Sequence, residues 1–569
     1  MFVFPDPKTK EPRAHYWQRV MEIIPGTLTW VTILGMFFFS FFLPVYVAIF
    51  IIIFDIYWIY RTVFIAYYSV EGYNRLKQGK EIDWWERCQN ISDPEKYVKM
   101  IAERVAQMKE SLAGCDICSR KERRIVKKEI ARQAAYLKEV EVIAKSAKSS
   151  PGNEILDWRE IVHVVMLPTA NEPAEIIEPA LQSIADANFP NQQFIILLAT
   201  EERELEAARM EKVNYLKNKF AGVFADFLVT THIVKGDEIK AKGSNATYAA
   251  NYLKKYLEEK NIDLKKVVFS NFDCDSVAHP QYFAALTYEY ITDPKRLQRS
   301  YQPLPMYHNN LWDTNAFVRV IVTGSSFWHI FQSTRDEGMV TFSSHSEPFD
   351  TLCKVNFWPL NMISEDSIIY WKCFSYYNGD YKVKPIYLPI SLDAVLAETY
   401  WKTIKNQYKQ KRRWAYGIEN FPVIMRAIVP NKKISLGKKI QVAFEMLEGH
   451  HSWATASVIL AILGWLPLIF GGDQFNQSVL AHNLPFITRY LMTLAMMGLV
   501  VSMSLSFLLM PPRPKKYSRW RNVYMLLQWA LVPIIAPFLG SMPAIESQTR
   551  LMIGKYFGEF WVTDKMRKQ

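Results

Sequence analysis

The sequence predicts an α/β domain with a mostly parallel sheet, combined with an α-helical region that crosses a membrane. Two apolar regions flank a polar stretch: residues 27–68 precede it, and a second apolar region begins after residue 450. From residue 160, short apolar runs alternate with charged helical stretches, which is typical of parallel strands connected by helices. With 569 residues, the chain is longer than one ordinary domain requires.

The first apolar region predicts a pair of membrane-spanning helices over residues 27–68, after an N-terminal segment over 1–26. A helix needs about 20 residues to cross the hydrocarbon core, so this region suits two helices better than one. Leu43-Pro44 is the expected turn, because proline interrupts the hydrogen-bond ladder of a helix. Such a hairpin returns the chain to the side of its basic N-terminus.

Residues 69–159 are highly charged and have helical periodicity over 95–112 and 120–146. We expect a solvated helical hairpin on the cytoplasmic face.

Residues 160–433 are predicted to form the α/β domain. Apolar runs at 161–167, 194–199, 227–234 and 267–272 predict strands. Ligands of such sheets bind at the carboxyl ends of the strands. The candidate residues at those ends are Pro168, Thr169, Asn171, Glu172, Glu201, Glu202, Asp273 and Asp275.

The C-terminal third predicts an amphipathic interfacial segment over 434–450, transmembrane helices over 451–545 and a tail over 546–569. The last apolar segment, 523–539, contains Pro533 and Pro537. A complete crossing there would place the basic tail outside, against the usual charge bias. We therefore expect a broken or re-entrant helix and a cytoplasmic tail.

The net charge is +12, and lysine and arginine gather beside the apolar spans. An excess of lysine and arginine beside apolar spans is typical of the cytoplasmic loops of membrane proteins. It fits such loops better than a surface that binds nucleic acid. Membrane lipid is thus an expected partner and nucleic acid is not.

Two short motifs indicate an anionic ligand and a metal ion. Asp273-Cys-Asp275 ends a strand, and its hard oxygen ligands suit Mg²⁺ or Mn²⁺ bridging a diphosphate; a solvated strand end is the alternative. Lys242 opens a predicted helix, where an ammonium group and free backbone amides favour an anion. An ordinary helix start would explain Lys242 equally.

Two further motifs suggest a base and a phosphate-binding helix. Glu365-Asp366 can act as a general base toward a hydroxyl group, or serve only as the acidic first turn of a helix. In Gln410-Lys-Arg-Arg413-Trp414, Arg413 suits diphosphate oxygens and Trp414 can stack on a sugar. A basic helix at lipid headgroups is the alternative.

In this order the motifs resemble those of membrane-integrated glycosyltransferases of family 2, the group of cellulose, chitin and hyaluronan synthases. The resemblance covers about residues 160–420, and the flanking spans in general layout. The sequences that carry it are Leu167-Pro-Thr-Ala-Asn-Glu-Pro173, Lys242 with Asn245, Asp273-Cys-Asp275, Ser364-Glu-Asp366 and Gln410-x-x-Arg413-Trp414.

The resemblance implies a GT-A-type catalytic domain on the cytoplasmic face of the cell (inner or plasma) membrane. It implies single-displacement, inverting transfer of a sugar from a nucleotide diphosphate sugar to a hydroxyl acceptor. Asp366, with Glu365, would be catalytic; Asp273 and Asp275 would hold Mg²⁺ or Mn²⁺; and Trp414 would contact the acceptor. The implied donor-binding residues are Pro168, Thr169, Asn171, Glu172, Glu201, Lys242, Asp273, Gln410 and Arg413.

The sequence departs from the family at two places. The second strand ends in Glu201-Glu202 where the family usually has Asp-Asp-Gly, so the donor nucleotide is left open. The loop Thr341–Ser346 lacks the usual paired glycines, and its His345 is a candidate acceptor contact or an ordinary loop histidine.

Three functions are consistent with these motifs. Synthesis of a polysaccharide is favoured, because the Gln410-x-x-Arg413-Trp414 motif lies between membrane spans. Transfer of one sugar to a lipid carrier is the alternative enzyme, so the acceptor is a saccharide or a lipid-linked molecule. A catalytically silent membrane scaffold is the alternative outside enzymology.

Overall fold

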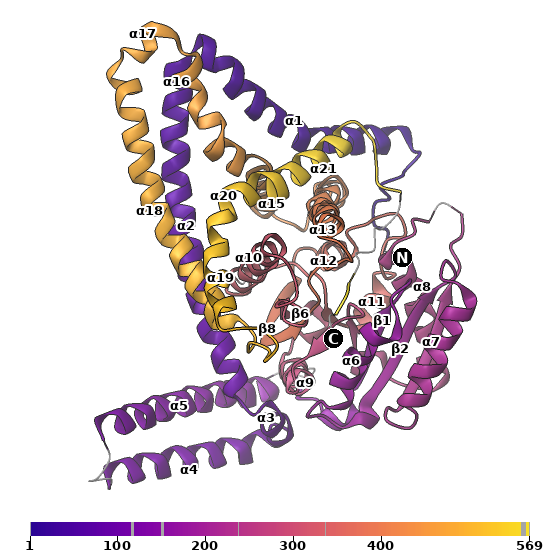
Figure 1. The fold of residues 1–569 in the computed structure, drawn as a ribbon. Helices are drawn as coiled ribbons and strands as arrows, with labels where there is room; N and C mark the ends of the chain where they lie inside the picture. The colour runs from indigo at the N-terminus through magenta and orange to yellow at the C-terminus, as the bar shows by residue number, and fades with distance from the viewer. Residues whose placement is uncertain are drawn as a thin grey trace.

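The computed structural model describes residues 2–114, 119–149, 153–236, 238–335, 337–558 and 565–567. One eight-stranded sheet forms the centre of an α/β domain, and long helices from both ends of the chain lie together beside it (Figure 1). The predicted fold class, a mostly parallel α/β domain combined with an apolar helical region, is confirmed.

The sheet has the strand order β3-β2-β1-β4-β7-β6-β8-β5. The pairs β1·β2, β2·β3, β1·β4 and β6·β8 are parallel, whereas the pairs that involve β7 or β5 are antiparallel. The strands are β1 (Val162–Pro168), β2 (Phe194–Glu201), β3 (Asp226–His232), β4 (Val267–Asn271), β5 (Val277–Ala278), β6 (Arg299–Met306), β7 (His345–Pro348) and β8 (Lys382–Ser391).

The central strands are apolar throughout because both faces of the sheet are covered by helices. Along β1, Val165 and Leu167 belong to one buried cluster, whereas Val164 and Met166 belong to the cluster on the opposite face. This alternation is the two-residue period of a strand. The helices of the domain are α6 (Ala174–Ala185), α7 (Glu206–Lys219), α8 (Lys242–Glu259), α9 (Tyr282–Thr292), α10 (Ala316–Ser333), α11 (Phe349–Lys354), α12 (Glu365–Tyr376), α13 (Tyr400–Ala415) and α14 (Asn420–Ile428).

Within the described residues, four helical segments are long and apolar enough to cross a membrane. Two come from the N-terminal part, α1 (Pro12–Phe42) and α2 (Pro44–Glu81), and the chain turns between them at Leu43. The others are α18 (Val479–Leu509) and the segment Trp520–Met552. Helix α15 (Leu436–Ala461) passes the same test only together with the bent continuation Leu463–Phe470, which includes α16 (Leu466–Phe470) and precedes α17 (Gly472–Asn476).

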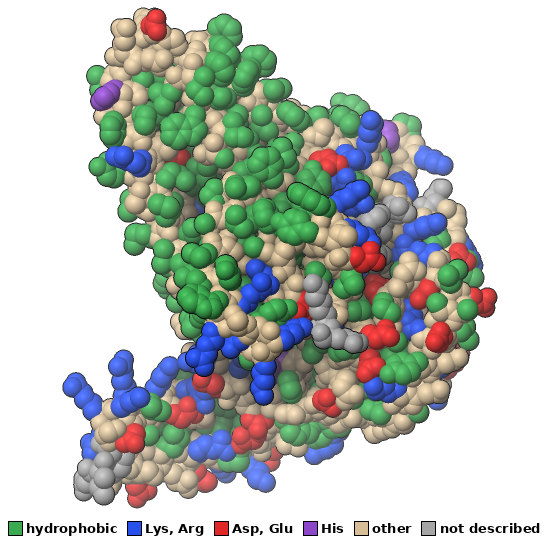
Figure 2. All heavy atoms as spheres, in the orientation of Figure 1, with side chains coloured by type: hydrophobic (Ala, Val, Ile, Leu, Met, Phe, Trp, Pro, Cys, Tyr) green, Lys and Arg blue, Asp and Glu red, His purple; other side chains and the backbone are tan. Residues whose placement is uncertain are grey.

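Apolar side chains gather on the outer surface of this helical part (Figure 2). They include Ile53 and Val63 of α2 and Met497 of α18, each more than half exposed. An apolar surface of this kind suits lipid rather than water.

The charged insertion forms α3 (Trp84–Asn90), α4 (Pro94–Ala113) and α5 (Arg120–Ser149). Helices α4 and α5 lie side by side and project from the α/β domain as a hairpin (Figure 1). Tyr97 and Tyr136 pack edge to face between them.

The last apolar segment is broken into short pieces: α19 (Trp520–Leu527), a 3-10 turn, α20 (Val532–Ile535), a π-helical turn at Ala536–Ser541 and α21 (Met542–Met552). Before it, Lys516 forms an ion pair with Asp313 (3.1 Å). After it, Lys565 reaches Asp275 (2.6 Å). The chain therefore contacts the α/β domain on both sides of this segment.

Candidate active site

A cavity of about 1070 Å³ lies among the described residues. It begins at the carboxyl ends of β1, β2 and β4 and continues between α10, α13 and α15 toward the apolar helices. Most of the residues expected from the sequence line it: Pro168, Thr169, Glu172, Glu201, Lys242, Asp273, Asp275, Glu365, Asp366, Gln410, Arg413 and Trp414.

Lys242 joins two of the predicted acidic groups. Its Nζ atom donates to Asp273 Oδ1 (2.9 Å) and to Asp366 Oδ1 (3.1 Å). Burial alone would lower the pKa of Lys242, but the neighbouring carboxylates outweigh it and the pKa is raised. The lysine therefore remains charged and holds together two carboxylates that are distant in the sequence.

A glycine permits this close packing at the start of α8. A Cβ atom at Gly243 would lie 2.9 Å from the Cβ of Glu365. Because glycine has no side chain, the first turn of α12 can approach the first turn of α8. Asp366 on α12 is thus brought within reach of Lys242.

Asp366 and Asp273 also share contacts with Ser343. The Ser343 amide donates to Asp366 Oδ2 (3.1 Å), and its hydroxyl donates to Asp273 Oδ2 (2.6 Å). Ser343 has a φ of 50°, a conformation that non-glycine residues rarely adopt. The loop before β7 is therefore shaped so that one serine orients both acids.

Glu365 and Asp366 are adjacent but lie in different environments. Glu365 is 3% exposed, and its burial and the neighbouring Asp366 raise its pKa to about 8. Asp366 instead accepts the Lys242 ion pair and the Ser343 amide. Near neutral pH, Glu365 is thus mainly protonated, whereas Asp366 is held by an ion pair and a backbone amide and is the candidate base.

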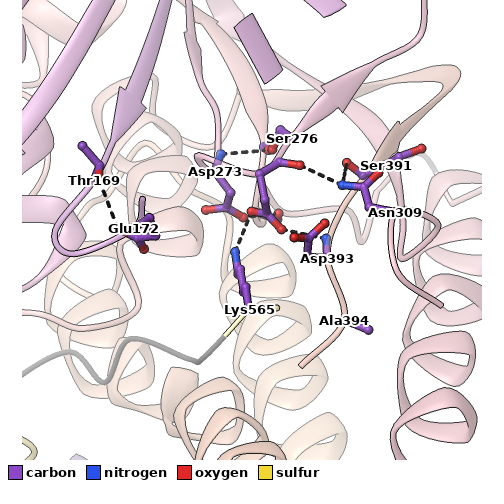
Figure 3. Close-up of polar contacts among 12 residues, drawn as sticks. Thr169, Glu172, Asp273, Ser276, Asn309, Ser391, Asp393, Ala394 and Lys565 are labelled. Carbon is purple, nitrogen blue, oxygen red and sulfur yellow. Dashed lines mark hydrogen bonds and ion pairs between the residues drawn. The ribbon is translucent and has the colours of Figure 1, made fainter. Parts of the chain in front are cut away.

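Asp275 is the most deeply buried of these acids, with 1% exposure. Its Oδ1 accepts from Lys565 Nζ (2.6 Å) and its Oδ2 accepts from the Asp393 amide (2.7 Å). Figure 3 shows Lys565 pointing toward the pair of aspartates. Burial raises the pKa of Asp275, and the Lys565 ammonium opposes that effect. Arg567 forms a second ion pair from the same part of the chain, with Asp393 (2.9 Å).

The Asp273 and Asp275 carboxylates fit a divalent metal ion in their chemistry. Among the residues that the structure describes, no cluster of three or more aspartate, glutamate, histidine or cysteine side chains could hold a metal. However, the Lys565 ammonium lies where a cation bound to Asp275 would lie. Asp273 and Asp275 would be the protein ligands of such an ion, since carboxylate oxygens are ligands that Mg²⁺ and Mn²⁺ prefer.

At the end of the cavity nearest the strands, Glu172 shapes the loop after β1. Its carboxylate accepts from the Ala170 amide (2.8 Å) and the Thr169 hydroxyl (3.2 Å). Glu201 is 3% exposed and pairs with Arg203 (2.5 Å). Asn171 is exposed and does not line the cavity, unlike the other residues predicted from this loop.

Helix α13 presents the Gln410-x-x-Arg413-Trp414 motif to the cavity. Gln410 accepts from Gln407 Nε2 (3.1 Å), and Trp414 lies against Tyr307 with ring centroids 6.4 Å apart. Arg413 is close enough to Glu365 to oppose the rise in its pKa. Arg413 is therefore the motif residue nearest to Glu365, and all three motif residues line the cavity.

His345 is placed differently from the sequence-based expectation of an acceptor contact. Its side chain is 0% exposed on β7, and its Nδ1 lies 2.9 Å from the carbonyl oxygen of Ser343. It does not line the cavity. It supports the Ser343 loop from within the sheet, because the two-residue period turns it away from the cavity.

Several site residues were not predicted from the sequence. Ser343, Arg203, Asp393 and Lys565 have no spacing motif, and Lys565 lies far from the acids along the chain. Of these four residues, only Ser343 lies in a segment that the sequence indicates, the loop Thr341–Ser346 that contains His345.

Comparisons with known proteins give only distant likenesses. No family model and no curated protein matches the chain. Among solved structures, a mannosyltransferase from Pyrobaculum calidifontis in complex with GDP-Man and Mn²⁺ is 14% identical over 59% of this chain and 86% of its own, with a TM-score of 0.32. S. aureus TarS residues 1–349 with UDP-GlcNAc is 12% identical over 61% of this chain and 91% of its own, with a TM-score of 0.32. The longer S. aureus TarS structure is 11% identical, and 55% of it is covered.

Proposed function

We propose that this protein is a membrane glycosyltransferase of the family 2 type that moves a sugar from a nucleotide diphosphate sugar to a hydroxyl acceptor with inversion. The observation that carries this proposal is the Lys242 bridge between Asp273 and Asp366. The bridge holds two acids together on the wall of one cavity. Asp273 is suited to the donor diphosphate, and Asp366 is suited to the acceptor hydroxyl. A silent scaffold would have no need for this arrangement.

In the proposed reaction, Asp366 takes the proton of the acceptor hydroxyl. The oxygen attacks the anomeric carbon of the donor sugar, a new C–O bond forms, and the bond to the diphosphate breaks. The nucleoside diphosphate leaves with the bonding electrons. A single displacement of this kind inverts the anomeric configuration.

The other residues stabilise the leaving group. Asp273 and Asp275 would hold a Mg²⁺ or Mn²⁺ ion, which supplies Lewis-acid stabilisation of the diphosphate when bound. Lys242 and Arg413 add positive charge from the cavity wall. Pro168, Thr169, Glu172 and Glu201 bound the part of the cavity that would receive the nucleotide.

The membrane arrangement supports a polymer as product. The cavity extends past Trp414 between α10, α13 and α15 toward the apolar helices, far beyond the space that one sugar needs. Because Lys565 reaches Asp275, the tail and the catalytic domain would lie on the same side of the membrane. We propose that this side is the cytoplasm. The last apolar segment would then re-enter the membrane without crossing it. Transfer of one sugar to a lipid carrier remains the competing product.

The test uses purified full-length protein, Mg²⁺ or Mn²⁺ and a panel of sugar nucleotides. The expected result is release of nucleoside diphosphate from one donor, and products of increasing mass separated by one sugar residue. A single mass increment on a lipid would support the competing enzyme. No release and no binding for any donor would reject the enzymatic proposal.

A further inference from the structure

Lys411 occupies an unusual position at the far end of the cavity. It lies within the motif on α13, between Gln410 and Arg413. Its ammonium nitrogen is 5.0 Å from the ring centroid of Trp414 and 5.1 Å from that of Trp453 on α15. All three side chains line the cavity. The lysine is therefore held between two indole rings at the edge of the open space.

Among the described residues, no carboxylate and no hydrogen-bond acceptor contacts the Lys411 ammonium group. Nearby cations are treated differently: Arg412 pairs with Glu546 (2.7 Å), and Arg61 pairs with Glu448 (2.9 Å). Lys411 is half-buried, and the indole faces attract its charge without neutralising it. In agreement, burial lowers the pKa of Lys411 to about 8, with no carboxylate opposing the shift.

The two rings are fixed in place by other contacts. Trp453 donates its indole N–H to the carbonyl of Gly540 (3.1 Å), and Trp414 packs near Tyr307. A pair of rigid aromatic faces at a cavity wall is suited to the faces of sugar rings. The cation between them is therefore part of a surface that can receive a sugar.

The adjacent His329 of α10 does not supply a counter-charge. Its ring lies 4.0 Å from that of Phe342, next to Ser343. Burial, together with Lys411, lowers the pKa of His329 to about 3, so the imidazole is neutral. Its Nδ1 has no hydrogen-bond partner among the residues that the structure describes. Lys411 is thus the cation beside the two indole rings that no carboxylate among the described residues pairs, since Arg61, which also lines the cavity, is paired with Glu448.

We propose that the acceptor is a saccharide carrying an anionic group, a carboxylate or a phosphate, which Lys411 binds while Trp414 and Trp453 stack on its sugar rings. The proposal rests on the proposed glycosyltransferase function and deepens it by naming the acceptor class. The anionic group of the acceptor pairs with the Lys411 ammonium group, which contacts no carboxylate among the described residues. Lys411 then determines acceptor specificity and takes no part in the chemical step at Asp366.

The competing interpretation is that Lys411 donates hydrogen bonds to the hydroxyls of a neutral sugar. A matched pair of acceptors separates the two. The pair is an oligosaccharide of uronic acids and the same oligosaccharide with its carboxyl groups reduced to alcohols. The shape is almost unchanged, and only the charge differs.

The experiment uses the full chain as wild type, Lys411→Met and Lys411→Arg. Hydrogen bonds to charged groups contribute enough for about a tenfold to hundredfold preference. We expect the wild type to show that preference in kcat/KM for the charged acceptor. Lys411→Met should lose it while keeping its activity on the reduced acceptor, and Lys411→Arg should retain it. Hydrolysis of the donor by water, which needs no acceptor, should be equal in all three.

A second arm compares polyprenyl phosphate with the corresponding alcohol. If only this pair shows a preference that depends on Lys411, the anionic group belongs to a lipid and the saccharide assignment is overturned. Equal use of charged and neutral acceptors by the wild type overturns the proposal whether or not the variants fold. So does an equal loss on both acceptors in Lys411→Met.

If the protein is not a glycosyltransferase, the experiment gives a different result. In that case no donor is hydrolysed by any variant. Equilibrium binding of the charged and reduced oligosaccharides to the wild type, measured by calorimetry without donor, still tests the anion preference. Tighter binding of the charged member supports the site, and equal binding overturns it.

Discussion

Replacing Asp366 by asparagine changes the reaction with little change of shape. Asp366 accepts hydrogen bonds from Lys242 (3.1 Å) and the Ser343 amide (3.1 Å). The asparagine amide oxygen can still accept one of them, and Lys242 keeps its ion pair with Asp273 (2.9 Å). The structural cost is therefore the loss of one charge-assisted hydrogen bond, about 1.5–3 kcal/mol.

The catalytic cost is larger, because an amide cannot take the acceptor proton. General-base catalysis typically contributes about 10²–10⁴-fold to a rate, or about 3–5 kcal/mol of barrier. We expect kcat to fall by that factor, while binding of the donor nucleotide stays almost unchanged. The assay is release of nucleoside diphosphate at saturating donor, with donor affinity measured separately.

The neighbouring Glu365 provides a matched control. Its pKa of about 8 leaves it mainly neutral near neutral pH, so Glu365→Gln replaces one neutral group by another of similar shape. We expect this variant to keep most of its activity. Similar losses in Glu365→Gln and Asp366→Asn would refute the assignment of the base. Wild-type turnover in Asp366→Asn would refute it as well.

Three further predictions concern the metal, the tail and the pH dependence of stability. Chelation should stop turnover, and Asp275→Ala should weaken binding of the donor diphosphate; full activity in excess chelator would exclude the role of the metal. Lys565→Ala should lower the Mn²⁺ concentration for half-maximal activity by roughly tenfold or more, because a charge-assisted bond to Asp275 no longer competes; a higher requirement would mean that Lys565 helps to hold the donor. Burial raises the pKa of Glu347 in the folded protein to about 8, above the value of about 4.3 in the unfolded chain. The protonated Glu347 therefore contributes to stability fully below the unfolded pKa, and this contribution is lost as the pH rises through about 8. Glu347→Gln should therefore flatten the fall in melting temperature between about pH 5 and pH 8, and an unchanged profile would contradict the shift.

The α/β core and the helix break at Leu43-Pro44 follow from local patterns in the sequence. Buried strands are apolar because they are covered on both faces, and a proline stops a helix whatever surrounds it. The helix that runs through 434–450 was harder to define. Its amphipathic pattern indicated an interfacial segment, whereas α15 continues without interruption from Leu436 to Ala461.

The candidate site was predictable where residues act in short motifs. Asp273, Asp366 and Arg413 each belong to one, and all line the same cavity. Contacts between distant parts of the chain were not predictable, because no local period encodes them. Lys565 contacts Asp275 although the two are 290 positions apart in the sequence, and Ser343 contacts both acids with its backbone in a left-handed conformation.

The positions of His345 and Lys411 also depend on contacts that the sequence does not show. His345 is a candidate acceptor contact from the resemblance of its loop, with an ordinary loop histidine as the alternative, and the structure buries its side chain on β7. The sequence shows Lys411 only as part of a motif, because its position between Trp414 and Trp453 depends on where α15 lies relative to α13. Such a site requires the tertiary structure.

The most direct test of the account is transfer itself, measured with purified wild-type protein and the Asp366→Asn variant. Each is incubated with the donor panel and metal, and both nucleoside diphosphate and glycosylated product are quantified by mass. The account predicts one productive donor, stoichiometric sugar transfer by the wild type and at least about a hundredfold loss in the variant that still binds donor. Equal transfer by both proteins, or no donor bound by either, would contradict it.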